Sequence, residues 1–370
     1  MAEYKEIIGK DNSVKTFSVI QNPTKDSPGI ADVMYRNVYS VYDVGTMRMP
    51  QDSKVDNSTI LAMAAKNFED LEKLGVKTHY LGVIGNNGKE TSVSTLLDKG
   101  ELPTAMRVLF VNKIKPVYDK GYNYNIFKSP TSNNYVVPLE VIFRNELPPE
   151  SSVWGRIERG ETTLTELGLS EDLKPGDVLP QAVIDISSKY ESKDRYVLKE
   201  EGRDMAGLSY DLWYPMIEAA EKINLFLTEK AESLGFTHPD GKVEFVRNGL
   251  DILLADVAGT WHEDRFSYNA QKISKQLMRD AHAIQDPEWA AQCKSAKTEA
   301  EKRQIEDWQS LLITDYTPLE PEFFEAYNNL TRAATNKWLG AKVFASTSLD
   351  DAIIQFKQYW DDFKSRKGAA

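Results

Sequence analysis

The sequence predicts a mixed fold of β-strands and α-helices, and three patterns predict it. Residues 242–256 contain two strand-like runs separated by turn residues, which is typical of a β-hairpin. Residues 58–74 and 204–234 carry apolar side chains three and four positions apart, as amphipathic helices do. From residue 274 to the end the pattern is helical throughout. We therefore expect a helical region to follow the part of the chain that contains the strands.

Bulk composition excludes several classes of function. The 370 residues carry a net charge of −11, which disfavours nucleic-acid binding because a phosphate backbone attracts basic surfaces. The single cysteine, Cys293, rules out an intrachain disulfide framework, and the four histidines lack the spacing of metal ligands. The start of the chain lacks the apolar core of a signal peptide, and no run of about 18 apolar residues is present. We expect a cytoplasmic protein with one large domain or two to three modest ones.

The first segment with recognisable chemistry is the turn from Gly9 to Lys15, which precedes a short strand. A glycine turn with a lysine on either side, here Lys10 and Lys15, can surround a polyphosphate with positive charge. A solvated hairpin explains the same residues. The aromatic and β-branched run that begins at Met34 is expected to be a strand ending at Asp43, which is either a strand cap or a functional carboxylate.

A helix is expected from Ser58 to Leu74. Asp56, Asn57 or Ser58 can cap its first turn, and Gly75 can end it.

Two strands are expected at residues 106–111 and 135–143, and the second leads directly into Arg144. Ser152 lies in a Ser-Ser pair that opens the next segment. An arginine at the end of a buried strand, together with serine hydroxyls, can hold a phosphomonoester. A structural arginine and an N-capping serine are the alternative interpretation.

Residues 184–196 are expected to form a strand that leads into a charged turn, which contains Lys189 and Asp194. By themselves these residues are typical of a solvated turn. A long amphipathic pair of helices is expected over residues 204–234, and Gly235 ends it.

The predicted hairpin carries the clearest chemistry. Lys242 and Glu244 alternate with apolar neighbours, and Asp256 ends the second strand, so Glu244 and Asp256 could face one another across the ladder. Two carboxylates with a lysine beside them suit Mg²⁺ and a nucleotide polyphosphate. A surface hairpin with solvated charges is the alternative.

In their order along the chain, these segments resemble the SAICAR synthetases, the phosphoribosylaminoimidazole-succinocarboxamide synthases of purine biosynthesis. The resemblance is carried by the Gly-Lys turn and by Tyr-Ser-Val-Tyr-Asp, Arg-Asn…Ser-Ser, Ser-Lys…Asp-Arg-Tyr, Lys-Val-Glu-Phe and Gly-Thr…Arg-Phe. It implies an α+β fold, similar to SAICAR synthetase and ATP-grasp folds. The implied parts are an N-terminal antiparallel-sheet domain at residues 1–115, an ATP-grasp-like domain at 116–270, and a C-terminal helical extension at 271–370.

The resemblance also implies an activity. It is that of an ATP-dependent carbon–nitrogen ligase, which joins carboxyaminoimidazole ribonucleotide to L-aspartate through an acyl phosphate. ATP and Mg²⁺ are the expected cofactors, with no nucleic-acid or membrane partner, and assembly into a homo-oligomer is compatible with the helical extension. The residues implied for the nucleotide are Lys10, Lys15, Lys242 and Glu244. Those implied for the metal are Glu244 and Asp256. Those implied for the phosphorylated substrate are Arg144, Ser152 and Arg265. Those implied near the reacting groups are Asp43, Lys189 and Asp194.

Several positions depart from the family's pattern, all on the substrate side. They are Asn57 for a lysine, Glu150 for a glycine, Gly155 for a lysine, His262 for an aspartate, and Asp264 for a small residue. These departures leave open a related ATP-dependent ligase that joins a different amine or acid. They also leave open a nucleotide-binding protein without turnover. His262 could further be a partly buried histidine with no catalytic role.

Overall fold

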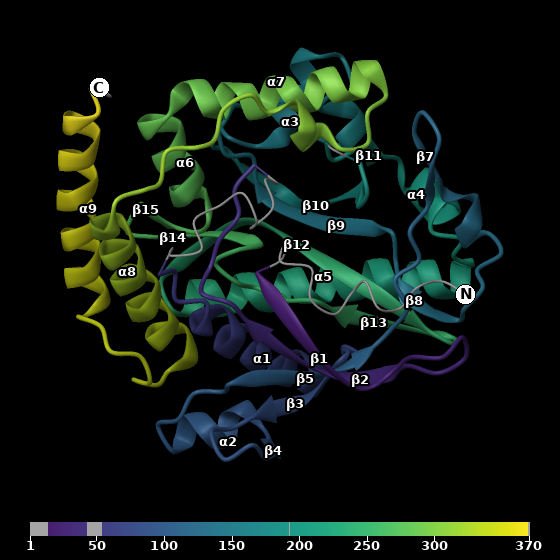
Figure 1. Cartoon of the computed structure of the whole chain (residues 1–370), viewed down its shortest axis with the longest axis horizontal. Helices are drawn as coiled ribbons and strands as arrows, with labels where there is room; N and C mark the ends of the chain where they lie inside the picture. The colour runs from purple at the N-terminus through teal and green to yellow at the C-terminus, as the bar shows by residue number, and fades with distance from the viewer. Residues whose placement is uncertain (1–13, 43–53, 192, 369–370) are drawn as a thin grey trace.

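A computed structural model describes residues 14–42, 54–191 and 193–368. Lys10 and Asp43, two of the residues expected in the site, lie outside the described residues. The described chain forms a five-stranded sheet, an eight-stranded sheet and a small two-stranded ribbon, together with helices that cover them (Figure 1). The combination confirms the α+β class.

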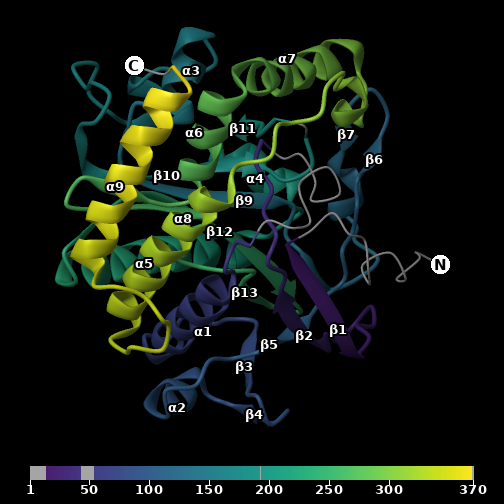
Figure 2. The ribbon, with the colours of Figure 1, turned by 60° about the vertical axis from the view of Figure 1, so that its left-hand side comes forward.

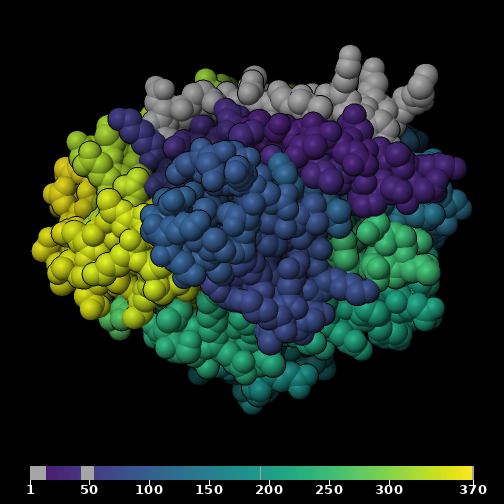
Figure 3. All heavy atoms as spheres, turned by 90° about the horizontal axis from the view of Figure 1, so that it is seen from below, coloured from purple at the N-terminus to yellow at the C-terminus, as the bar shows by residue number. Residues whose placement is uncertain are grey.

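The five-stranded sheet is antiparallel throughout. Its strands in spatial order are β1 (Lys15–Gln21), β2 (Gly29–Tyr35), β5 (Ala105–Phe110), β3 (Tyr80–Ile84) and β4 (Glu90–Thr91). Helix α1 (Ser58–Lys73) contacts β2, β3 and β5, and the short α2 (Val93–Asp98) contacts α1. Figure 3 shows this region as the purple and blue face of the molecule, with the C-terminal helices beside it in yellow.

The eight-stranded sheet is built around one long strand, β12. The first part of β12 pairs with β9 and β14, and from Glu244 onward it pairs with β13. The change of partner therefore falls where Lys242 and Glu244 lie. The strands of this sheet are β11 (Tyr196–Val197), β10 (Val178–Ser188), β9 (Leu139–Glu146), β12 (Phe236–Asn248), β14 (Asp264–Tyr268), β15 (Gln271–Ile273), β13 (Asp251–Ala255) and β8 (Asn134–Val136).

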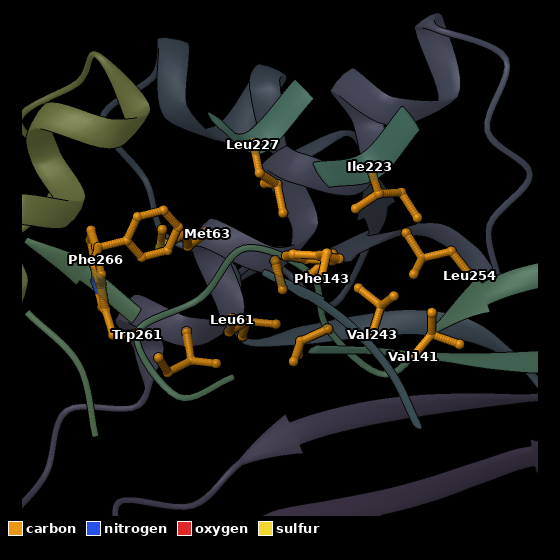
Figure 4. Packing of buried hydrophobic residues seen from close by; sticks show 14 of the residues in the cluster. Leu61, Met63, Val141, Phe143, Ile223, Leu227, Val243, Leu254, Trp261 and Phe266 are labelled. Carbon is orange, nitrogen blue, oxygen red and sulfur yellow. The ribbon is translucent and has the colours of Figure 1, made fainter. Parts of the chain in front are cut away.

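One face of this sheet is apolar because side chains alternate along each strand. Val141 and Phe143 on β9 and Val243 on β12 are buried on that face, where Ile223 and Leu227 of helix α5 (Tyr210–Ser233) are labelled nearby in Figure 4. The opposite face of the same strands carries the charged residues. The alternation of apolar and polar residues thus separates a packed core from a polar face.

The C-terminal part is helical, as expected. Its helices are α6 (Gln276–Gln285), α7 (Pro287–Arg303), α8 (Pro321–Leu339) and α9 (Leu349–Arg366). Helix α8 packs against α1 and α9 (Figures 1 and 2). Its Trp338 contacts the rings of Trp261 and Phe266. A single hydrophobic cluster contains residues of both sheets and of these helices. None of the helices in the described part of the chain is both long and apolar enough to cross a bilayer.

Three local expectations were wrong in detail. The strand expected to run to Asp43 ends at Tyr35. The strand expected at residues 135–143 is divided into β8 and β9, because Pro138 has no N–H for the ladder. The helix pair expected over residues 204–234 is one long helix, α5, which begins only at Tyr210. The short α4 (Lys199–Met205) precedes it, and Gly207, with a φ of +60°, lies between the two helices. The division into domains at residues 115 and 270 stays a prediction.

Gly241 of β12 gives a sharp test of packing between this strand and its neighbours β9 and β14. A Cβ at this position would lie 2.0 Å from Asp264 Oδ1 and 2.4 Å from the ring of Phe143, both buried. We expect Gly241→Ala to lower the free energy of unfolding by about 1–3 kcal/mol, as overpacking does. Chemical denaturation measures this. The matched control is Gly155→Ala in a helix, where the added Cβ meets only the end of the Arg159 side chain; an equal loss in both variants would contradict the packing argument.

Candidate active site

The polar face of the eight-stranded sheet forms the candidate active site. Cross-strand pairs share a face, and Asp240 pairs with Arg144 on one side and Arg265 on the other. Lys242 and Glu244 lie two and four residues beyond Asp240 on the same strand, so they point to the same side. The β-strand alternation noted in the sequence therefore brings most of the expected site residues together.

Lys15 and Asp256 join the two sheets at one end of this face. Lys15 is the first residue of β1, Asp256 follows β13, and their side chains form an ion pair. Burial lowers the pKa of Lys15, but the Asp256 carboxylate, helped by Tyr35, outweighs it and the pKa is raised overall. Asp256 has a φ of +65°, a conformation that residues other than glycine seldom adopt. Such a conformation is common where a fold holds a functional group in place.

Lys242 is the centre of a second cluster. Its Nζ lies 2.7 Å from Glu140 Oε1, 3.1 Å from Glu263 Oε2 and 3.8 Å from Glu244 Oε1. Glu244 is paired in addition with Lys189, so two ammonium groups face three carboxylates. The structure thus brings Lys242, Glu244 and Lys189 into one connected group, which also includes two glutamates.

The carboxylates of this cluster differ in their electrostatics. Burial raises the pKa of Glu244 and of Glu263, but the lysines outweigh it, so both carboxyls have lowered pKa values. The pKa of Glu140 is raised to about 7, because burial and the carboxylates of Glu244 and Asp194 outweigh Lys242 and Lys189. Of the carboxylates around Lys242, Glu140 is therefore the one best placed to exchange a proton near neutral pH.

A small cavity of about 50 Å³ lies beside the Lys15 pair. Tyr35, Lys15, His262, Glu263 and Lys275 are among the residues that line it. This cavity therefore brings together side chains from two segments that are far apart in the sequence. They are the start of β1 and the loop before β14.

The donor set of Glu244 and Asp256 suits Mg²⁺ as a partner of a nucleotide polyphosphate. Protein sites of this kind use one or two carboxylates, and phosphate oxygens and waters complete the octahedron. The described residues contain no cluster of three or more His, Cys, Asp or Glu side chains arranged to hold a metal ion by themselves. Each of the two carboxylates forms an ion pair with a lysine, Asp256 with Lys15 and Glu244 with Lys189.

A row of alternating charges crosses the sheet at the other end of the polar face. Arg144 lies 3.1 Å from Asp185 and 3.8 Å from Asp240, and Arg265 pairs with Asp240. Arg156 of helix α3 (Ser152–Glu158) lies 2.6 Å from Asp185. The order is therefore Arg156, Asp185, Arg144, Asp240, Arg265, with an arginine at each end. We call these five residues the charged row.

Ser152 lies against this row, as expected for a residue near Arg144. Its Oγ is 3.1 Å from Arg144 Nη2 and 2.7 Å from the Tyr196 hydroxyl. Ser151, not Ser152, caps α3 by accepting from the Val153 N–H. Ser152 is thus available for a polar contact rather than used by the helix end.

Asp194 lines a larger cavity of about 370 Å³ next to the charged row. The wall also includes Arg156 and Tyr196, together with residues of α7 and of the ribbon β6 (Val117–Tyr118) and β7 (Tyr122–Asn123). Asp194 therefore lies apart from the Lys15 pair, although its charge reaches Glu140.

Three of the five departures from the family's pattern have structural partners here. Asn57 is buried and donates to the carbonyls of Arg36 and Val38, each at 2.7 Å. Asp264 is buried, accepts from Thr260 N–H and lies 3.0 Å from His238 Nε2. Glu150 pairs with Lys272. Asn57 and Asp264 are thus bonded within the fold, whereas Glu150 forms an ion pair with a half-exposed lysine.

Several residues of this face were missed in the sequence interpretation: Glu140, Asp185, Arg156, Asp240 and Glu263. The period-2 rule could have found three of them. Asp240 lies two residues before Lys242, Glu140 lies four before Arg144, and Asp185 sits within an apolar strand. Arg156 and Glu263 reach the site from a helix and a loop, for which strand alternation carries no signal.

His262 predicts a pH dependence of stability. Its pKa is lowered to about 3, because burial disfavours the imidazolium and Lys275 repels it. The unfolded chain, with a histidine pKa near 6.5, binds a proton that the folded chain does not, so stability is complete above pH 6.5 and falls on acidification. At pH 5 we expect a loss of about 2 kcal/mol from this group alone.

Urea unfolding at pH 5 and pH 7.5 measures the effect. The free energy of unfolding should fall less between pH 7.5 and pH 5 in His262→Gln than in the unmodified protein. His79 and His282, whose pKa values are lowered to about 3 and about 4, contribute to the fall in both proteins. An unchanged drop in the variant would show that His262 is protonated in the folded state.

Comparisons with known proteins find related sequences and similar folds. A family model described as SAICAR synthetase matches residues 24–296. A protein of Archaeoglobus fulgidus, provisionally named phosphoribosylaminoimidazole-succinocarboxamide synthase, is 31% identical over 347 residues, which cover 94% of this chain and 98% of that protein. Phosphoribosylaminoimidazole-succinocarboxamide synthase of Thermoplasma acidophilum is 31% identical over 253 residues, which cover 66% and 75%.

Among solved structures, the fold is similar to that of a SAICAR synthase from Saccharomyces cerevisiae, described as complexed with SAICAR. The TM-score is 0.53 at 17% identity, over 88% of this chain and 96% of that one. The family match spans most of the chain, and the Archaeoglobus relative is matched over nearly its whole length. This chain belongs to the SAICAR synthetase family.

Proposed function

We propose that this protein is an ATP-dependent ligase that joins the carboxylate of carboxyaminoimidazole ribonucleotide to the amine of L-aspartate. The observation that carries the proposal is the single polar sheet face, which places a lysine and carboxylate cluster beside a row of arginines. The first suits a nucleotide polyphosphate and its metal, and the second suits a phosphorylated substrate. The Archaeoglobus and Thermoplasma relatives, named as synthases of this reaction, support it.

Lys15, Lys189 and Lys242 would stabilise the phosphates of ATP. All three are paired with carboxylates in this structure, so ATP would have to share or replace those partners. Glu244 and Asp256 would hold Mg²⁺, which, when bound, would neutralise charge on the phosphates during transfer. Catalysis of this kind rests mainly on positioning and on electrostatic stabilisation.

The substrate carboxylate would receive the γ-phosphoryl group of ATP and become an acyl phosphate. The aspartate amine then attacks that carbonyl carbon, the C–N bond forms, and phosphate leaves with the bonding electrons. The amine must lose a proton, and Glu140, with a pKa of about 7, could accept it at a carboxylate oxygen. Arg144, Ser152 and Arg265 would hold the ribonucleotide phosphate while this occurs.

The test is ADP release by the purified protein with Mg²⁺-ATP and carboxyaminoimidazole ribonucleotide, with and without L-aspartate. We expect ADP release that depends on aspartate, together with a succinocarboxamide product identified by mass. ADP release with another amine, but not with aspartate, would replace the substrate and keep the reaction class. ATP binding without ADP release under every pairing would show that the protein is not a ligase.

The alternative of a related ligase with other substrates is not favoured. It was suggested by departures at Asn57, Glu150, Gly155, His262 and Asp264. Asn57, Glu150 and Asp264 have structural partners, so these changes need no change of substrate to explain them.

A further inference from the structure

The charged row carries more positive than negative charge. Arg144, Arg156 and Arg265 supply three guanidinium groups, and Asp185 and Asp240 supply two carboxylates. The two carboxylates and Arg144 are at most 6% exposed, and Arg156 is 8% exposed. Arg265 is 25% exposed, so the buried part of the row is balanced in charge, and a ligand would be recognised by guanidinium N–H groups that these carboxylates leave unused.

Arg156 is the end of the row that reaches the 370 Å³ cavity. Its Nη1 donates to Asp185, and its guanidinium stacks over the Tyr196 ring, 4.0 Å from the ring centroid. A guanidinium has five N–H donors in a planar fork, and Asp185 is its one hydrogen-bond acceptor within the described residues. Arg156 is thus held rigidly, with donor capacity left, in the wall of a cavity of the size that small molecules occupy.

The neighbours of Arg156 also favour an oxyanion. The Tyr196 hydroxyl lies in the same wall and is hydrogen-bonded to Ser152, which contacts Arg144. Three other basic residues of the wall are more exposed and pair with glutamates: Arg159 with Glu161, Lys193 with Glu301 and Arg195 with Glu201. Arg156 differs from them in being buried, with N–H donors left for a ligand.

We propose that Arg156, supported by Tyr196, binds an oxyanion of a substrate in this cavity. Two sources share this chemistry, the phosphate of the ribonucleotide and a carboxylate of the amino acid, since both match the guanidinium fork. The inference rests on the proposed function for its substrates, but it concerns a residue and a cavity outside the roles assigned above.

The test compares Arg156→Gln with Arg159→Gln, an arginine of the same cavity that is 53% exposed and paired with Glu161. Calorimetry measures binding of two probes, inorganic phosphate and L-aspartate, and kinetics gives KM for each substrate. We expect Arg156→Gln to weaken one probe and raise the matching KM by about tenfold to a hundredfold, with a smaller change in kcat. Arg159→Gln should stay within about twofold of the unmodified protein.

Each outcome either identifies the oxyanion that Arg156 binds or overturns the inference. A loss confined to phosphate identifies the phosphomonoester as the ligand, and a loss confined to aspartate identifies the carboxylate. No loss for either probe, no binding of either probe to the unmodified protein, or equal losses in both variants would overturn the inference. If Arg156→Gln does not fold, Arg156→Lys keeps the positive charge beside Asp185 but loses the fork, and it should still weaken the same probe. Failure of the proposed function would appear separately, as absence of the succinocarboxamide product while probe binding still responds to Arg156.

Discussion

Asp256→Asn is expected to lower kcat by about a hundredfold to a thousandfold while the protein stays folded. The carboxylate proposed to hold Mg²⁺ becomes a neutral amide, which weakens stabilisation of the transferring phosphoryl group, and effects of this size follow loss of one such group. The fold should tolerate the change, because asparagine adopts the positive φ of +65° found at this position more readily than most residues. ADP release under saturating substrates measures the loss.

The matched control for this prediction is Asp251→Asn, at the other end of the same strand. Asp251 is 48% exposed and pairs with Lys77 on the surface. Its variant should keep nearly full activity, because exposed pairs contribute little. Full activity in Asp256→Asn would remove this residue from the metal site.

Lys242→Met is expected to destabilise the fold strongly and to abolish turnover. The substitution leaves the carboxylates of Glu140, Glu244 and Glu263 without their shared cation. Breaking a fully buried pair costs about 3–5 kcal/mol, and because these side chains are 14–26% exposed we expect a loss near the lower end of that range. The loss should be smaller at pH 5.5 than at pH 7.5, because the carboxyls, no longer stabilised by Lys242, can become protonated at the lower pH. Urea unfolding at the two values measures it.

Lys272→Met serves as the control, since Lys272 is 48% exposed and pairs only with Glu150 among the described residues. Its effect on stability should be below about 1 kcal/mol at both pH values. A loss in Lys242→Met that is equally small, or that does not change with pH, would mean that the three carboxylates are not held by this lysine.

Local patterns in the sequence determined much of this protein. Helix α1 begins at Ser58 as the cap residues predict, and the C-terminal helices occur where the apolar spacing places them. The β12–β13 hairpin is present as expected, although Asn248 pairs with Asp251 and the turn is therefore Gly249–Leu250. Glu244 pairs with Ala255, so it does not face Asp256 across the ladder as expected, because Asp256 lies one residue beyond β13. These features depend on residues close together in the chain, so the local sequence predicts them without knowledge of the tertiary structure. The order of the motifs also pointed to the family.

Only the tertiary structure decided which charges share a site. Lys15 and Asp256 are 241 residues apart, and their ion pair exists because the two sheets meet. Asn57 and Asp264 looked like altered substrate residues, but their partners are backbone groups and a histidine brought near by folding. Alternation along a strand shows which residues share its face, but not which strand lies beside it. That choice depends on packing across the whole core, and it is what turned scattered lysines, arginines and carboxylates into one polar face.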